Sequence, residues 1–322
     1  MLYRCLIVGL GQIGMGYDYA LDPRKFVLSH ARSFSTHPDF ELIGGVDPDP
    51  NRCANFETEY KISGYTNLDQ ALSDLSPEII VIATPSSLHG LILERILCSH
   101  IPKAIVCEKP MDTSLEVARN MVEICNQTGV KLFVNYMRRS EGSVIQIKKM
   151  IDRQAIQSPI KAVVWYSKGL LNNGSHMLNL LEYWLGDVIG HTMIDANRSW
   201  NDSDPEPDFK VSFEKGSAIF CASWEEYFSH LSVELISPSG RLYYSEGGSD
   251  ITWQPSGATL DNRRDDFLDL GAKINNDLDR YQYNFAENLA LALKGKEHSI
   301  SSGHDALTTL TNIYNIINKG TS

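Results

Sequence analysis

The sequence lacks the features that mark membrane, secreted and nucleic-acid-binding proteins. No apolar run reaches the roughly 18 residues that a membrane-spanning helix needs, and the N-terminal residues enter an apolar strand without the flanks of a signal peptide. Basic residues are the minority, with 29 Lys and Arg against 40 Asp and Glu, and the net charge of -11 opposes binding to a phosphate backbone. We therefore expect a cytoplasmic protein without a membrane or nucleic-acid partner.

Cysteine is also sparse and irregularly placed. The six cysteines fall at scattered spacings with no Cys-x-x-Cys pair, so the sequence predicts neither a redox motif nor a zinc site, and we expect no bound metal. The 322 residues are 43% hydrophobic and 21% charged, which is an ordinary globular composition. This length suits about two domains.

Residues 1–135 alternate short apolar runs with longer helical stretches, which is typical of a parallel sheet with crossover helices. We predict strands at Cys5–Val8, Phe40–Val46, Ile79–Ala83, Ala104–Cys107 and Val130–Asn135. The predicted helices are Leu28–Phe34, Pro50–Glu59, Leu68–Leu75, Leu88–Ser99 and Ser114–Thr128. The first domain is therefore predicted to be α/β with a doubly wound parallel sheet.

Residues 136–322 have a different pattern, because several predicted strands follow one another without helices between them. Helices are predicted at Gly142–Asp152 and Ser175–Leu185, and again from about Asn276 to Leu293 and from Asp305 to Ile317. The predicted strands are Ile160–Ser167, Thr192–Trp200, Asp208–Phe213, Ser217–Trp224, Leu231–Ile236, Arg241–Ser245 and Asp250–Trp253. A hairpin turn is predicted at 237–240. This succession favours an α+β domain on a mostly antiparallel sheet.

A glycine-rich turn follows the first strand and suits a backbone that approaches a pyrophosphate closely at a helix N-terminus. Its candidate cofactor-binding residues are Gly9, Gly11, Gln12, Ile13 and Gly14. The second strand ends at Asp47, whose carboxylate would accept hydrogen bonds from an adenosine ribose. The spacing exceeds the usual ~20 residues, which indicates an insertion at about Met15–Phe26. That insertion is either a surface loop or a lid over cofactor or substrate.

Two further motifs follow predicted strands at their carboxyl ends, where ligands of open α/β sheets bind. The first contributes Thr84, Pro85 and His89 as candidate cofactor-binding residues, and the second contributes Glu108. Lys109 comes next and could exchange a proton beside a nicotinamide ring, although taken alone it is better explained as a surface lysine.

A polar helix face in the second domain adds candidates for substrate contact. His176 and Asn179 are three residues apart and share one face of the helix at Ser175–Leu185, with Asn172 just before it. A polar face at a helix start suits a ligand cleft, whereas an isolated histidine is more often structural.

In this order, the glycine turn, Asp47, Thr-Pro-x-x-x-His, Glu-Lys-Pro and the Gly-x-His helix resemble the Gfo/Idh/MocA oxidoreductase family. The resemblance implies an N-terminal Rossmann domain and a C-terminal α+β domain whose open sheet forms dimer or tetramer contacts. It also implies a nicotinamide cofactor, Lys109 and His176 as catalytic residues, and a cis bond between Lys109 and Pro110. The carboxylate of Asp47 predicts that this cofactor is NAD rather than NADP.

The sequence departs from the family pattern Asp-x-Gly-x-His-x-x-Asp, because Asn172 and Asn179 stand at the two acidic positions. An amide cannot take up a proton, so a proton relay would depend on Lys109 and His176. Tyr136 and Arg138 follow the last strand of the first domain as further candidate substrate-binding residues, since an arginine can bind a phosphate or carboxylate in a fork.

These observations predict an NAD(H)-dependent oxidoreductase that moves a hydride to or from a hydroxyl or keto carbon of a sugar or sugar derivative. Nucleotide-linked and acidic sugars are among the candidate substrates. Two alternatives stay open. One is a cofactor-bound sugar sensor that has lost turnover together with the acidic residues. The other is a reductase of the same fold that acts on a non-sugar acceptor.

Overall fold

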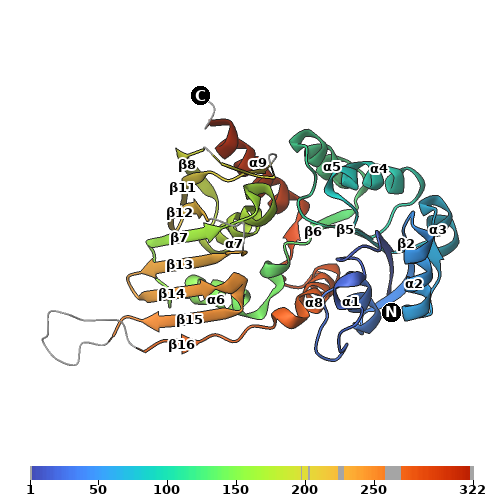
Figure 1. The fold of residues 1–322 in the computed structure, drawn as a ribbon, viewed down its shortest axis with the longest axis horizontal. Helices are drawn as coiled ribbons and strands as arrows, with labels where there is room; N and C mark the ends of the chain where they lie inside the picture. Colours follow the sequence, from blue (N-terminus) through green and yellow to red (C-terminus); the bar gives the residue numbers. More distant parts are fainter. Residues whose placement is uncertain (1, 197, 202–203, 224–227, 258–269, 320–322) are drawn as a thin grey trace, which may run out of the picture. The chain divides into compact units, whose positions relative to one another are not determined.

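The computed structural model describes all residues except 1, 197, 202–203, 224–227, 258–269 and 320–322. The chain forms two compact units (Figure 1). The first comprises Met1–Ser140 and Asp279–Thr308, and the second comprises Glu141–Leu278 and Thr309–Ser322. The predicted boundary after residue 135 assigned residues 279–308 to the second domain, whereas the structure places them in the first unit.

The first unit is built on a sheet of seven strands, six of which are parallel to their neighbours. They are β1 (Tyr3–Val8), β2 (Phe40–Val46), β3 (Gly64–Tyr65), β4 (Ile79–Ile82), β5 (Ala104–Cys107), β6 (Lys131–Val134) and β17 (Ser301–Ser302). Their order is β17-β6-β5-β4-β1-β2-β3, and only β17 pairs antiparallel. The order reverses beside β1, which is where open α/β sheets bind their ligands. The predicted doubly wound sheet is confirmed.

Helices cover both faces of this sheet. They are α1 (His30–Thr36), α2 (Pro50–Tyr60), α3 (Leu68–Leu75), α4 (His89–Ser99), α5 (Leu115–Thr128) and α8 (Tyr281–Leu293). Phe34, Phe56 and Phe285 bring α1, α2 and α8 into the apolar core on one face, while α4 and α5 lie side by side on the other (Figure 1). This burial explains why residues 279–308 belong to the first unit: α8 shares its core.

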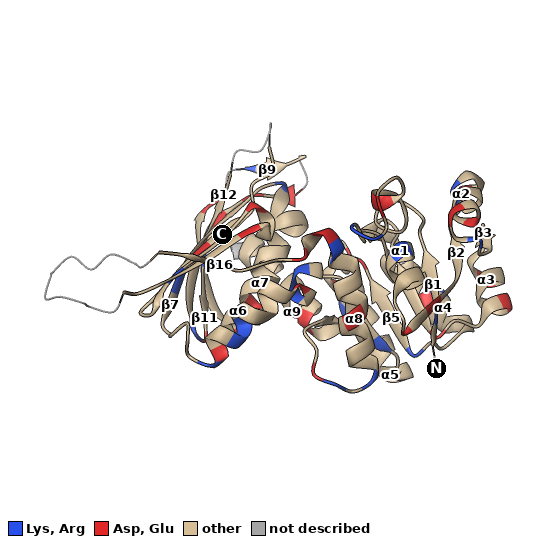
Figure 2. Ribbon diagram, turned by 90° about the horizontal axis from the view of Figure 1, so that it is seen from below, with Lys and Arg blue, Asp and Glu red and all other residues tan. Residues whose placement is uncertain are grey.

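The second unit contains a sheet of eight strands in the order β16-β15-β14-β13-β7-β12-β11-β8. The strands are β7 (Ile160–Tyr166), β8 (Val188–Asp195), β11 (Asp208–Phe213), β12 (Gly216–Ala222), β13 (Ser232–Ser237), β14 (Gly240–Ser245), β15 (Asp250–Pro255) and β16 (Ala272–Lys273). The helices α6 (Gly142–Asp152) and α7 (Ser175–Leu185) lie on one side of it (Figure 2), and α9 (Gly303–Lys319) adds Ile313 and Ile316 to the same core. Residues along β7 alternate between buried and exposed, so the opposite face carries side chains such as Val163 and Trp165.

Three details of the second unit differ from the sequence prediction. The predicted strand Thr192–Trp200 is two strands, β8 and β9 (Ser199–Trp200), and β9 pairs with β10 (Asp204–Pro205) in a separate ribbon. The strand predicted to end at Trp224 ends at Ala222, and Trp224 lies outside the described residues. β12 pairs parallel with β7, while all other pairs in this sheet are antiparallel.

No helix in the described part of the chain is both long enough and apolar enough to cross a membrane. Within those same residues, no cluster of three or more His, Cys, Asp or Glu side chains could hold a metal ion.

Candidate active site

A pocket of about 670 Å³ opens at the carboxyl ends of β1, β2 and β4 in the first unit. Seven of the predicted cofactor-binding residues line it, namely Gly9, Gly11, Gln12, Ile13, Asp47, Thr84 and Pro85. Sequence motifs that are up to 76 positions apart therefore meet in one site.

The glycine turn has the shape that a dinucleotide requires. Gly9 has φ +100° and lies so close to the β4 end that an added Cβ would be 2.5 Å from the Ala83 carbonyl oxygen. Gly14 packs against Gly9, because its added Cβ would be 2.0 Å from the Gly9 oxygen. Gly11 instead borders open space, where an added Cβ would meet only Arg52, at 3.9 Å. The backbone thus leaves room for a pyrophosphate to approach at Gly11, so the residues present fit a nicotinamide dinucleotide.

Asp47 connects the turn to the end of β2. Its buried carboxylate accepts hydrogen bonds from the Leu10 amide at 2.9 Å and the Asp49 amide at 3.0 Å, and Arg52 Nη1 lies 3.2 Å away. The carboxylate therefore fixes the glycine turn, and Asp47 also lines the pocket.

The pocket also has an apolar wall that the sequence motifs did not reveal. Leu88 and Leu91 line it and are 41% and 65% exposed, which is unusual for large apolar side chains and suits a ligand with a flat ring. The three-residue spacing of these leucines at the start of α4 was the available sequence signal. Thr66, Leu68, Ile92 and Arg95 complete this side of the pocket.

His89 does not line this pocket, and its predicted role as a cofactor contact stays a prediction. The ring is fully buried, with Nε2 2.8 Å from the Thr84 carbonyl oxygen and Nδ1 3.1 Å from the Met111 carbonyl oxygen. It connects the loop after β4 to the segment after β5. His89 therefore holds both loops in position through these two contacts.

Glu108 likewise lies outside the pocket lining, within a buried polar network. Its Oε1 is 2.7 Å from His30 Nε2 and 2.7 Å from Asn135 Nδ2, and Asn135 Nδ2 also contacts Gln282. Burial alone would raise the pKa of Glu108, but the His30 and Asn135 contacts and the Lys109 charge lower it overall. The network holds an ionised carboxylate and joins α1, β5, β6 and α8 directly before Lys109.

Lys109 follows β5 and is partly buried, and its bond to Pro110 is cis, as the family resemblance implied. Tyr136 is buried and Arg138 is partly exposed, both directly after β6. The neighbouring Arg139 donates from Nε to the Ser299 carbonyl oxygen at 3.1 Å, so its guanidinium ties the chain after β6 to the segment before β17.

In the second unit the predicted substrate residues lie along one helical segment. Asn172 lies in a helical turn, Gly169–Gly174, that leads directly into α7, and His176 is in the first turn of α7. Asn179 is buried and donates from Nδ2 to Thr309 Oγ1 at 3.0 Å. This contact joins α7 to α9, and the predicted substrate contact of Asn179 stays a prediction.

Two acidic residues that sequence reasoning missed hold this segment in place. Asp204 accepts hydrogen bonds from the amides of Leu171 at 2.8 Å and Asn172 at 2.9 Å, and Glu206 accepts one from the Gly169 amide at 3.0 Å. Burial raises the pKa of Asp204 despite these bonds. Thirty residues separate the acids from the turn, and no local pattern connects them.

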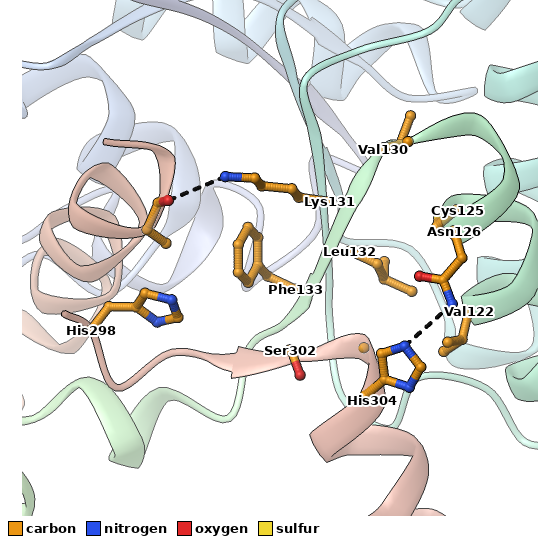
Figure 3. Close-up of a pocket in the computed structure, with 13 residues that line it drawn as sticks. Val122, Cys125, Asn126, Val130, Lys131, Leu132, Phe133, His298, Ser302 and His304 are labelled. Carbon is orange, nitrogen blue, oxygen red and sulfur yellow. Dashed lines mark hydrogen bonds between the residues drawn. The ribbon is translucent and has the colours of Figure 1, made fainter. Parts of the chain in front are cut away.

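A second hollow of about 400 Å³ in the first unit lies beside β6, at the start of α9 (Figure 3). Lys131 Nζ donates to the Ala292 carbonyl oxygen across it, and His304 Nε2 lies 3.2 Å from Asn126 Nδ2. None of the sequence-predicted site residues lines this hollow.

Comparison with known proteins agrees with this geometry. Residues 3–136 match the Gfo/Idh/MocA family model, described as an oxidoreductase family with an NAD-binding Rossmann fold. The chain is 26% identical over 265 residues to scyllo-inositol 2-dehydrogenase (NAD(+)) of Bacillus subtilis, which covers 74% of this chain and 73% of that one. Several other matched relatives share less than two thirds of their length with it.

Solved structures share the fold over nearly the whole chain. A putative NADPH-dependent oxidoreductase from Desulfitobacterium hafniense has a TM-score of 0.80 at 18% identity, covering 99% of this chain and 95% of that one. The WlbA dehydrogenase from Bordetella pertussis, in complex with NADH and UDP-GlcNAcA, has a TM-score of 0.75 at 19% identity, covering 99% and 96%. Residues 3–136 are therefore an NAD-binding Rossmann domain of the Gfo/Idh/MocA oxidoreductase family.

Proposed function

We propose that this protein is an NAD-linked dehydrogenase or reductase of a hydroxyl or keto carbon in a sugar or polyol derivative. The observation that carries the proposal is the pocket at the glycine turn, where Gly11 borders open space and Asp47 is a lining residue. The relatives supply the substrate class, since one is an inositol dehydrogenase and a structural neighbour holds a nucleotide-linked sugar.

The charges around Asp47 favour NAD over NADP. A 2′-phosphate on the ribose would meet the buried Asp47 carboxylate, and the nearby Arg52 is shared between Asp47 at 3.2 Å and Asp49 at 3.8 Å. Two carboxylates outweigh one guanidinium here, so a phosphate would be repelled. We expect NADH to bind at least tenfold more tightly than NADPH. Equal affinities in parallel titrations would refute this preference.

We assign the proton chemistry to Lys109. When bound, the nicotinamide supplies the hydride acceptor or donor. In the oxidation direction Lys109 takes the hydroxyl proton as the carbon loses its hydride, and it returns that proton in reduction. The ionised Glu108 and its buried network fix the main chain directly before Lys109.

In the second unit, we assign His176 to hydrogen bonding of the reacting oxygen and Asn172 to a neutral contact with the substrate. Asp204 fixes the main chain at Asn172, which holds the start of the helix that carries His176. An amide at 172 suits a hydroxyl rather than a cationic group.

Arg138 extends the proposal to anionic sugars. It lies directly after β6 and is partly exposed, and a bidentate arginine contact contributes roughly 1.5 to 3 kcal/mol. The test is NADH formation with matched pairs, each neutral sugar or inositol against its phosphorylated, nucleotide-linked or uronic form. The anionic member should saturate at about tenfold or more lower concentration, and Arg138→Ala should remove that difference.

The same panel separates the alternatives. NADH binding without turnover on any member would favour a sugar sensor. Equal saturation by neutral and charged partners, unaffected by Arg138→Ala, would favour a neutral polyol as substrate.

We also propose that the protein self-associates through the exposed face of the eight-stranded sheet. Val163, Trp165, Ile219 and Ile236 on this face are 37% to 46% exposed. Single exposed apolar side chains are ordinary, but a group on one face of a sheet is typical of an interface.

A further inference from the structure

The insertion between the glycine turn and α1 is held firmly at its beginning. The amide of Gly16 donates to the Gly11 carbonyl oxygen at 3.0 Å, and that of Tyr17 donates to the Gln12 carbonyl oxygen at 2.9 Å. The main chain at Tyr17 is therefore bonded to the turn that lines the dinucleotide pocket.

A buried carboxylate closes the insertion on itself. Asp18 has no exposed surface and accepts hydrogen bonds from the Leu28 amide at 2.6 Å, the Ser29 amide at 2.9 Å and the Ser29 hydroxyl at 2.7 Å. The end of the insertion is also bonded to α8, because the Tyr281 hydroxyl donates to the Leu28 carbonyl oxygen at 2.8 Å. The sequence did not decide whether this insertion is a surface loop or a lid. Its hydrogen bonds make it a fixed wall beside the glycine turn.

Tyr17 is a residue of this wall that lines the pocket. It does so together with Gly11, Gln12 and Ile13, and it remains 54% exposed. Tyr19, two residues along the same insertion, is 43% exposed but is not part of the pocket lining. A large ring on an anchored backbone loses little conformational freedom when a ligand covers it.

The hydrogen bonds of the insertion indicate which end of the pocket Tyr17 occupies. Asp18, the next residue, is bonded to the start of α1, where His30 Nε2 lies 2.7 Å from Glu108 Oε1, directly after β5. Tyr17 therefore lies toward the β5 side of the unit. Asp47, at the end of β2, marks the opposite, adenosine side of the pocket.

We propose that Tyr17 is a cofactor-binding residue whose ring packs on the nicotinamide-ribose half of the dinucleotide, held in place by Asp18. The proposal deepens the NAD-linked function proposed above and rests on it. The packing is apolar, so the ring rather than the hydroxyl provides the contact. The role is one of affinity and orientation, and no proton passes through Tyr17.

The test measures the binding of NADH and of ADP, which lacks the nicotinamide-ribose half, to the full chain by calorimetry. Tyr17→Ala should weaken NADH binding on the order of tenfold and leave ADP binding unchanged, since a ring contact of this kind is worth about one decade of affinity. Tyr17→Phe should stay within about threefold of wild type for both ligands. Tyr19→Ala is the matched control and should bind NADH as the wild type does.

Asp18→Asn tests whether the hydrogen bonds of Asp18 hold Tyr17 in place. Circular dichroism establishes that each variant is folded. A folded Asp18→Asn should lose part of the NADH affinity with Tyr17 intact. If Tyr17→Ala binds NADH as tightly as wild type, or loses NADH and ADP affinity alike, Tyr17 does not contact the nicotinamide half. If the wild type binds neither NADH nor ADP, the proposed cofactor itself is wrong, and so is the role of Tyr17.

Discussion

At the scale of single residues, Glu108 shows how a buried charge is used beside a proposed catalytic group. A carboxylate in the interior costs free energy unless its oxygens are paired, and here His30 and Asn135 both contact Oε1 at 2.7 Å. Removing one partner leaves the other buried and unsatisfied. The residue is therefore sensitive to both mutation and pH.

The lowered pKa of Glu108 predicts a loss of stability in acid. In the unfolded chain a glutamate has a pKa of about 4.3, whereas in the folded state the proton binds only at lower pH. The ionised form thus stabilises the fold above about pH 4.3, and this contribution disappears as the pH falls through the folded-state pKa. In urea unfolding, Glu108→Gln should cost about 1 to 3 kcal/mol at pH 7 and less at pH 3.5.

The exposed Glu41→Gln is the control for that experiment and should change the unfolding free energy by less than about 0.5 kcal/mol at either pH. A Glu108→Gln penalty that stays constant from pH 7 to pH 3.5 would show that the ionised form contributes nothing to stability.

The proposed proton chemistry predicts a separation of turnover from cofactor binding. Lys109→Ala and His176→Ala should each lower kcat by about 10²- to 10⁴-fold, the usual contribution of a positioned proton-transfer group. NADH affinity should change little, because neither residue lines the dinucleotide pocket. Lys161→Ala, an exposed lysine on the second unit's sheet, should keep wild-type turnover. Unchanged kcat in either active-site variant would remove that residue from the mechanism.

The sequence predicted the dinucleotide site better than the direction of individual side chains. A motif at a strand end indicates which edge of the sheet it reaches, and this sufficed for Gly11, Asp47 and Thr84. It does not tell whether a side chain turns toward the ligand or toward neighbouring main chain, and His89 does the latter. Tyr17 was missed because an insertion has no periodic pattern that would reveal its exposed face.

At the scale of elements, the turn before α7 depends on contacts that are distant in sequence. Gly169 has φ +85°, and an added Cβ would be 1.9 Å from Asp204 Oδ2. An alanine there would be strained in its backbone and would displace the carboxylate that holds Leu171 and Asn172. The position of His176 is therefore set partly by a strand beyond α7.

Gly169→Ala should lower the free energy of unfolding by about 2 kcal/mol or more and also reduce kcat, because the helix start that carries His176 would shift. Gly190→Ala in β8 is the matched control, since its added Cβ has no atom within 4 Å and its φ is not positive. It should be neutral within about 1 kcal/mol. Equal unfolding free energies for the two variants would contradict this account of the turn.

Element boundaries were predicted well where the signal is local. The N-cap at Ser114 and the C-cap at Gly129 bound α5 where the sequence placed it, and α6 and α7 match the predicted ranges. The parallel pairing of β7 with β12 was not predicted, since pairing depends on contacts between residues 56 positions apart. The same holds for α8, whose helix was predicted but whose core partners in the first unit were not.

At the scale of the whole molecule, the exposed face of the second unit's sheet is the feature that the monomer leaves unexplained. Val163 and Ile219 are register partners on neighbouring strands, and with Ile236 they line a shallow hollow of about 380 Å³. Lys161, Lys210 and Glu234 border the same hollow, so charges of both signs surround an apolar centre. An apolar centre with a polar rim is the usual composition of a protein interface.

Self-association through this face makes a prediction that one substitution can test. A stable dimer buries roughly 1,200 to 2,000 Å² in total, and a charge at the apolar centre of such an interface would be desolvated without a partner. Light scattering should therefore give the wild type a mass at least twice the 36.1 kDa of the chain, and Ile219→Asp should reduce it to that of one chain. Ile101→Asp, at a more exposed isoleucine in the first unit, should leave the assembly intact. A wild type with the mass of a single chain, or an Ile219→Asp variant that still assembles, would show that this face does not join two copies.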